Sequence, residues 1–166
     1  MKQKRIAGMT LMELLCALAV VLLVSAGMVL GVSLAVRSYE RSVTNSEAQV
    51  LCSTLQAIVK DELRYAGTLE YENGRVVGFF SQEHANADSK YSRFITDSDG
   101  RVLLGGQKLL PNNAYPHGLR AAVELTDYDK ATRIFTAVVT VTDRSGDTLA
   151  QTEFQVKQLN EPAEQT

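Results

Sequence analysis

Residues 14–36 read LLCALAVVLLVSAGMVLGVSLAV, and this stretch decides how the chain is organised. Its 23 residues include no charged side chain. At a rise of ~1.5 Å per residue, a helix of this length crosses the ~30 Å hydrocarbon layer of a membrane. Three positive charges (Lys2, Lys4 and Arg5) precede it, and a polar, hydropathically mixed sequence follows Val36. The sequence therefore predicts a short basic leader, one membrane span and one soluble domain.

The whole chain has the size of a single domain with an accessory segment. It contains 166 residues, with 17 Lys and Arg against 19 Asp and Glu, for a net charge of −2. A chain with this balance has no general basic field that would hold a polyanion. We therefore expect no bulk binding of nucleic acid.

Three kinds of N-terminus share a basic leader and an apolar run: a cleaved secretory signal, a permanent single-pass anchor and a prepilin-type leader. Val24-Ser25-Ala26 offers the small residues that a signal peptidase needs. However, Glu13 stands at the head of the apolar run, and residues 28–36 continue the run for about two turns past that site. An ordinary signal peptide needs neither feature, so the secretory alternative is disfavoured.

The segment Gly8-Met9-Thr10-Leu11-Met12-Glu13 combines a glycine at the end of a basic leader with a carboxylate five residues later. An uncharged apolar helix follows directly. This combination resembles the N-terminal cleavage and methylation motif of type IV pilins and pseudopilins. The resemblance covers residues 2–41 strongly and the rest of the chain only in its general layout.

The resemblance implies a role for three residues. Gly8 would be the last residue of the leader, which a prepilin peptidase removes on the cytoplasmic side of the membrane. Met9 would be the first mature residue and the site of N-methylation, although phenylalanine is the most common residue there in the family. Glu13 would be the fifth mature residue, which in the family pairs with the N-terminal amine of an adjacent subunit during assembly.

Glu13, Gly27 and Gly31 can also be interpreted from physical chemistry alone, without the resemblance. A carboxylate near the apolar layer costs several kcal/mol unless it is paired, and the alternative for Glu13 is a hydrated position at the headgroup boundary. Gly27 and Gly31 form a small-xxx-small pair that lets helix backbones approach closely. The alternative for the glycines is that Gly is simply common in membrane helices.

Beyond the span, residues 45–65 show helical periodicity. Apolar residues recur at three- and four-residue steps at Ala48, Leu51, Cys52, Leu55, Val59 and Leu63. Because neither Pro nor Gly occurs from Leu34 to Ala66, we expect one continuous helix that ends at Gly67. Alternatively, Thr44 and Glu47 form a capping box that starts a separate helix.

After Gly67 the pattern changes to strands. Asn73-Gly74 and Asp99-Gly100 are turn signals between apolar runs. Three alternating runs follow, at 119–126, 135–141 and 150–156, with turns expected at 127–130 and 144–147. We predict an α+β, pilin-like fold in which the long helix packs against an antiparallel meander. The predicted parts are a leader (1–8), a transmembrane and assembly helix (9–36), an extracytoplasmic head (37–160) and a disordered tail (161–166).

The sequence offers little support for catalysis, a metal site or a cofactor. His84 and His117 fall in expected loops without metal-ligand spacing or a nucleophile partner. Asp97-Ser98-Asp99-Gly100 is similar to part of a calcium loop, but an EF-hand register puts Gly106 where a bidentate Glu belongs, which favours a turn. Cys16 and Cys52 lie about 54 Å apart on a continuous helix and cannot pair within one chain.

We therefore expect a structural subunit of a pilus or pseudopilus, with other subunits, an inner-membrane assembly platform and lipid as its partners. In the family that the chain resembles, many major pilins close a C-terminal loop with a disulfide, which a chain with cysteines only at positions 16 and 52 cannot form. The resemblance therefore favours a minor pilin or pseudopilin, or a lineage that avoids such bridges. Secretion, competence, adhesion and motility systems all use such subunits. The chain would be a single-pass membrane protein with a cytoplasmic N-terminus and an extracytoplasmic head. The alternative is a membrane-anchored extracytoplasmic binding module that never polymerises.

Overall fold

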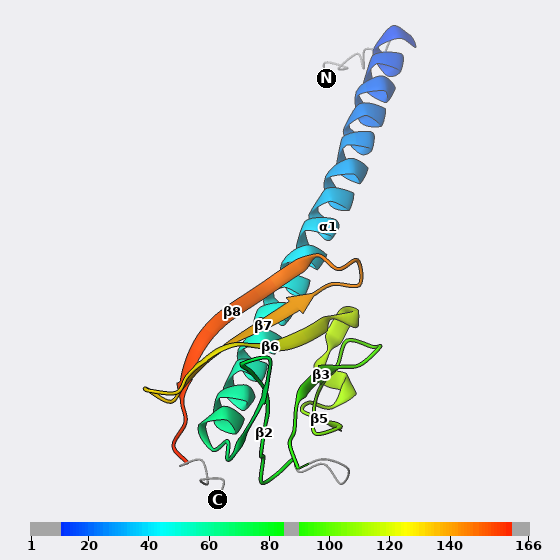
Figure 1. Cartoon of the computed structure of the whole chain (residues 1–166). Helices are drawn as coiled ribbons and strands as arrows, with labels where there is room; N and C mark the ends of the chain where they lie inside the picture. The colour runs from blue at the N-terminus through cyan, green and yellow to red at the C-terminus, as the bar shows by residue number, and fades with distance from the viewer. Residues whose placement is uncertain (1–10, 85–89, 161–166) are drawn as a thin grey trace, which may run out of the picture. The chain divides into compact units, whose positions relative to one another are not determined.

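The computed structural model describes residues 11–84 and 90–160, which form one long helix followed by small antiparallel sheets (Figure 1). The helix α1 comprises Leu11–Arg64, 54 residues without interruption. The chain divides into two units, residues 1–42 and residues 43–166. The second unit, which we call the head, contains the C-terminal part of α1 and all the strands.

The head holds three separate antiparallel sheets. The first pairs β1 with β2, the second has the order β3-β4-β5, and the third has the order β6-β7-β8. The bounds in the described residues are β1 Leu69–Glu72, β2 Arg75–Phe79, β3 Phe94–Thr96, β4 Val102–Leu104, β5 Gln107–Lys108, β6 Arg120–Asp129, β7 Ile134–Thr142 and β8 Thr148–Lys157, with short 3₁₀ helices η1 at Asn112–Ala114 and η2 at Pro116–Gly118.

The core of the head lies between α1 and the third sheet. The six helix positions predicted from periodicity, Ala48, Leu51, Cys52, Leu55, Val59 and Leu63, are the buried residues of α1. In β7 every second residue is buried, as period-two alternation requires. The Cys52 thiol lies 3.8 Å from the Val139 carbonyl oxygen, and burial raises the pKa of this thiol. Cys52 is thus a small buried group facing the sheet, as predicted, and both cysteines are free.

One buried glutamine ties the end of α1 to the third sheet. Gln158 is fully buried, and its amide nitrogen donates to the carbonyl oxygens of Ala66 and Gly67, each at 2.9 Å. Its side-chain oxygen accepts a 2.7 Å hydrogen bond from the Tyr128 hydroxyl. The carbonyl groups that follow the helix would otherwise be buried without a partner, so Gln158 satisfies them.

The coarse expectation, an α+β chain with a long N-terminal helix and antiparallel strands, is confirmed. The Asn73-Gly74 and Asp99-Gly100 turns also lie where the sequence predicted them. The alternative of a separate helix beginning at Thr44 is wrong, because α1 runs through Thr44 and Glu47 without a break.

Two predicted boundaries are wrong. The helix ends at Arg64, before Gly67, which does not adopt the left-handed conformation of a glycine cap. Gly67 is instead held close to Phe80: its N–H donates to the Phe80 carbonyl oxygen at 2.8 Å, and an added Cβ would lie 3.0 Å from the Phe80 ring. The turn expected at 127–130 also comes later, because a bulge between Leu125 and Asp127 lets β6 continue to Asp129.

Candidate functional site

The most unusual surface of the described chain is the N-terminal half of α1. Every residue from Leu11 to Ser42 is exposed. Among the large apolar side chains of Leu11–Val36, the exposed fraction runs from 50% at Val36 to 80% at Leu11. A continuous apolar surface of this size is unfavourable in water. Within the described residues, α1 is the one helix whose length and composition suit a membrane span.

Glu13 is the only charged residue between Leu11 and Val36, and it lies in the first turn of α1. A carboxylate at a helix N-terminus interacts favourably with the unpaired N–H groups and the helix dipole there. Gly8 and Met9, the predicted cleavage and methylation residues, lie outside the described residues.

Gly27 and Gly31 leave open space along the apolar half. Apart from the adjoining residues and backbone of α1, a Cβ built on either glycine would meet no atom of the described chain within 4 Å. The neighbouring hydroxyls need no outside partner, because Ser25 donates to the Val21 carbonyl oxygen and Ser33 to the Val29 carbonyl oxygen within the helix. The glycine surface is therefore a place where another helix backbone could approach closely.

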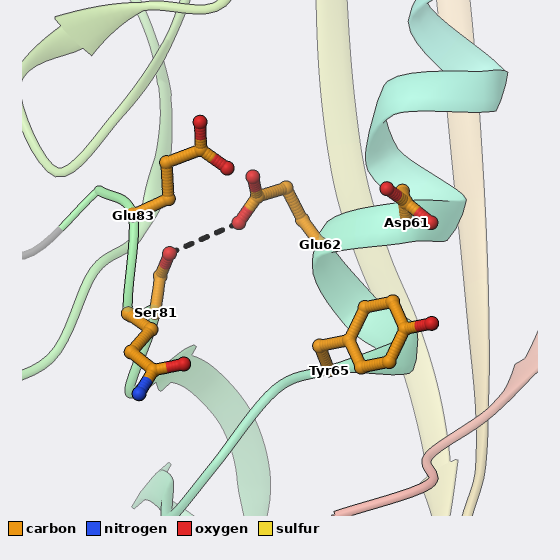
Figure 2. A pocket seen from close by; sticks show the side chains of 6 residues that line it. Asp61, Glu62, Tyr65, Ser81 and Glu83 are labelled. Atoms are coloured by element: carbon orange, nitrogen blue, oxygen red, sulfur yellow. Dashed lines mark hydrogen bonds between the residues drawn. The ribbon is translucent and has the colours of Figure 1, made fainter.

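The head contains an acidic pocket of about 380 Å³ beside the end of α1. Figure 2 shows Asp61 and Glu62 on the helix and Glu83 on the segment that follows β2. Tyr65, Ser81 and Gln82 complete the lining. The Ser81 hydroxyl donates to Glu62 Oε2 at 3.0 Å, and His84 Nδ1 lies 3.0 Å from Glu62 Oε1.

The order of these contacts, Ser81 to Glu62 to His84, differs from that of a hydrolytic triad. In a triad the imidazole touches the hydroxyl and takes its proton, and the carboxylate orients the imidazole from the far side. Here the carboxylate lies between the other two groups. The Ser81 oxygen also accepts a 3.0 Å hydrogen bond from the His84 backbone N–H, so the contacts attach this loop to α1.

The two histidine contacts are not predictable from the sequence around them. His117 Nε2 lies 3.2 Å from Glu47 Oε2, which links η2 to α1 in the same way that His84 links its loop. Each histidine is far from its glutamate in sequence, and no local pattern connects the two. Only the tertiary fold could have revealed these pairs.

The Asp97-Ser98-Asp99-Gly100 segment forms a turn. Asp97 Oδ1 accepts the backbone N–H groups of Asp99 and Arg101, at 2.9 and 2.8 Å. The Arg120 guanidinium donates to the Ser98 carbonyl oxygen, so a cation of the protein already lies at this loop. Across residues 11–84 and 90–160, no group of three His, Cys, Asp or Glu side chains is placed to hold a metal ion.

Comparisons with known proteins give no further guide, because no family model, curated protein or solved structure matches the chain.

Proposed function

We propose that the protein is a structural subunit, of the minor class, of a type IV pilus or pseudopilus. In this proposal a prepilin peptidase removes the leader after Gly8, and the mature chain assembles through its N-terminal helix. The observation that carries the proposal is the order of features in one segment: basic leader, Gly8, Glu13 and an intact apolar run to Val36. A secretory signal requires neither Glu13 nor the apolar turns beyond Ala26.

The exposure of α1 supports this proposal. The head builds its core from the C-terminal part of the helix, whereas Leu11–Val36 contributes no buried residue. This apolar half must be covered by lipid before assembly and by neighbouring helices afterwards, because water is an unfavourable solvent for it. In lipid there is no hydrophobic driving force between helices, so they associate through close packing of their backbones. Gly27 and Gly31 allow this close approach.

The same proposal sets the location and partners of the chain. It is a single-pass membrane protein whose N-terminus is cytoplasmic and whose head is extracytoplasmic. Its partners are the prepilin peptidase, other subunits, the inner-membrane assembly platform and lipid. We assign it no catalytic step, and the contact order at Ser81, Glu62 and His84 agrees with a structural role for these three side chains.

The test separates cleavage from assembly through Glu13→Gln. This change removes the charge and keeps the shape, so we expect mature chains that begin at Met9 and remain in the membrane but are depleted from sheared filaments at least about tenfold. Intact-mass analysis locates the N-terminus, and quantitative blotting of sheared filaments measures incorporation. Glu40→Gln, on the same helix beyond the apolar run, is the matched control and should assemble normally.

Each wrong outcome has a distinct meaning. A mature N-terminus at Gly27 would establish a secretory signal, and an intact Met1 would establish the non-polymerising anchored module. Filament incorporation of the Glu13→Gln chain at the wild-type level would remove the pairing role of Glu13 and return it to a hydrated boundary position.

A further inference from the structure

The two edges of the β6-β7-β8 sheet differ in how they are covered. At the β6 edge, the Ala121 backbone N–H donates to the Gly100 carbonyl oxygen at 2.8 Å. The Ala121 carbonyl oxygen accepts the Thr96 hydroxyl at 3.3 Å. The segment that contains β3 and the following turn thus forms hydrogen bonds with the backbone of this edge.

β8 is the opposite edge of the sheet, and Figure 1 shows it at the outer margin of the head. It is ten residues long and pairs with β7 on one side only within the described residues. An edge of this length carries a row of N–H and C=O groups that can pair with another chain.

The register identifies which backbone groups face outward. The Gln158 N–H donates to the Arg133 carbonyl oxygen at 2.8 Å, one step beyond the Ile134–Lys157 pair, so this is a hydrogen-bonded pair of the ladder. Hydrogen-bonded pairs recur at every second residue of an antiparallel ladder. The backbone groups of Thr152, Phe154 and Val156 therefore face β7, and the alternating residues Gln151, Glu153, Gln155 and Lys157 present theirs to the open side.

An independent contact agrees with this assignment. If odd-numbered residues of β7 bond to β8, the even-numbered ones must face β6. The Thr136 carbonyl oxygen does face β6, because it accepts the Thr126 hydroxyl at 3.1 Å. Hydrogen bonds to both neighbours of the central strand therefore give the same parity.

The side chains of the open residues form an exposed face with a charge pattern. Gln151, Glu153, Gln155 and Lys157 are all exposed, whereas Phe154 and Val156 are buried on the opposite face. Glu153 and Lys157 have opposite charges and lie on the same face, four residues apart. An added strand is therefore favoured when its own charges are opposite to these two.

We propose that the β8 edge is a strand-addition site for an extended segment of another protein chain. The segment pairs antiparallel with β8, with a basic residue opposite Glu153 and an acidic residue opposite Lys157. The positions opposite Phe154 and Val156 are apolar, because they extend the buried face of the sheet, and the position opposite Gln155 is polar. Main-chain hydrogen bonds provide affinity in this mode, and alternate side chains provide specificity.

A second copy of the chain fits this edge poorly. Pairing β8 of one copy with β6 of the next is blocked by the segment that covers Ala121. Pairing β8 with β8 needs a two-fold axis through the sheet, which reverses the direction of α1 in the partner. This exclusion rests on the proposed function, in which every subunit assembles through its own N-terminal helix and all these helices run in the same direction.

The test uses the full chain in detergent micelles and a designed peptide as the probe. The peptide alternates Val with polar residues and carries Lys opposite Glu153 and Glu opposite Lys157. We expect hydrogen exchange at the Gln151, Glu153, Gln155 and Lys157 amides to slow at least about tenfold when the peptide is bound. Exchange at Phe154 and Val156 should change little, because those amides already bond to β7.

Two controls make the result decisive. A peptide with its Lys and Glu exchanged should bind at least about fivefold more weakly. Gln155→Pro removes one outward N–H and no bond to β7, so peptide affinity should fall about tenfold or more while the head melts within a few degrees of wild type. Gln155→Ala keeps the N–H and should bind within about twofold of wild type.

Several results would overturn the proposal. They are equal binding of the two peptides, uniform rather than alternating protection, and unchanged affinity of the Gln155→Pro chain. Outward amides that become protected with rising protein concentration, without peptide, would show that a second copy occupies the edge. None of these measurements depends on cleavage after Gly8, so a failure here leaves the proposed function to its own test.

Discussion

The two halves of α1 share one regular backbone but obtain their stability from different surroundings. From Ala48 to Leu63, six residues on one face are buried in the head. From Leu11 to Val36 the helix is apolar on every side, and every residue is exposed. A helix with one apolar face packs on a protein core, whereas a helix that is apolar all round needs an apolar environment on all sides. The head therefore contains the partner of one half, and the other half needs an external one.

The difference also shows how a change in periodicity can divide a single helix by function. Polar residues appear between the apolar ones from Arg37 onward, and the buried face begins at Ala48. No break of the backbone is needed, because the solvent preference of the side chains changes along an intact helix. Truncating a buried apolar side chain in the second half should therefore destabilise the head much more than truncating an exposed one in the first half.

The largest expected effect contrasts Leu55→Ala with Leu22→Ala. Leu55 is fully buried, so its truncation should lower the free energy of unfolding of the head by about 2–5 kcal/mol. Leu22 is 62% exposed and should change it by less than about 0.5 kcal/mol. Urea unfolding in micelles, followed by tyrosine fluorescence, measures both, because none of the six tyrosines lies between Leu11 and Val36.

The control for this comparison is Val50→Ala, an exposed position on the same helix within the head. It should change the free energy of unfolding as little as Leu22→Ala does, because the exposure of the side chain, and not its half of α1, decides the cost of truncation. Comparable losses of stability for Leu22→Ala and Leu55→Ala would contradict the division of α1 into two environments.

A smaller loss of stability is expected from removing a polar side chain, and its size should differ between the head and the apolar half of α1. Gln158→Leu leaves the Ala66 and Gly67 carbonyl oxygens and the Tyr128 hydroxyl without their partner, so we expect a loss of about 1–3 kcal/mol. Ser25→Ala removes a hydroxyl that bonds only to its own helix and should cost less than about 0.5 kcal/mol. The same urea titration compares them, and a neutral Gln158→Leu would show that water satisfies the end of α1.

Local patterns were sufficient to predict α1 and most of the strands. The buried face of α1 and the Asn73-Gly74 hairpin follow from spacing and turn chemistry, which act over a few residues. The N-terminal motif is equally local, but Gly8 and Met9 lie outside the described residues, so their roles stay predictions.

Features that depend on distant contacts were not predictable. The helix ends before Gly67 because that residue is already bonded to Phe80, and no pattern around Gly67 indicates this partner. The bulge after Leu125 depends on how β6 fits β7, so the turn was expected too early. The Glu62–His84 and Glu47–His117 contacts likewise need the tertiary fold to bring their residues together.

The last contrast concerns thiol reactivity instead of stability, and it separates burial by the protein from burial by detergent. Cys52 is buried in the head and burial raises the pKa of its thiol, so a maleimide should reach it only when the head opens. In a Cys16→Ala chain, unfolding with urea should accelerate labelling of Cys52 on the order of 100-fold. In a Cys52→Ala chain, labelling of Cys16 should change little across the same transition, because Cys16 is already exposed and belongs to the other unit of the chain. Ser53→Cys in a chain without the native cysteines supplies the matched control, since its side chain lies next to Cys52 in sequence but on the exposed face of α1. Rapid labelling of Cys52 in the native head would place the Leu51 and Leu55 face outward and contradict the burial of this half of α1.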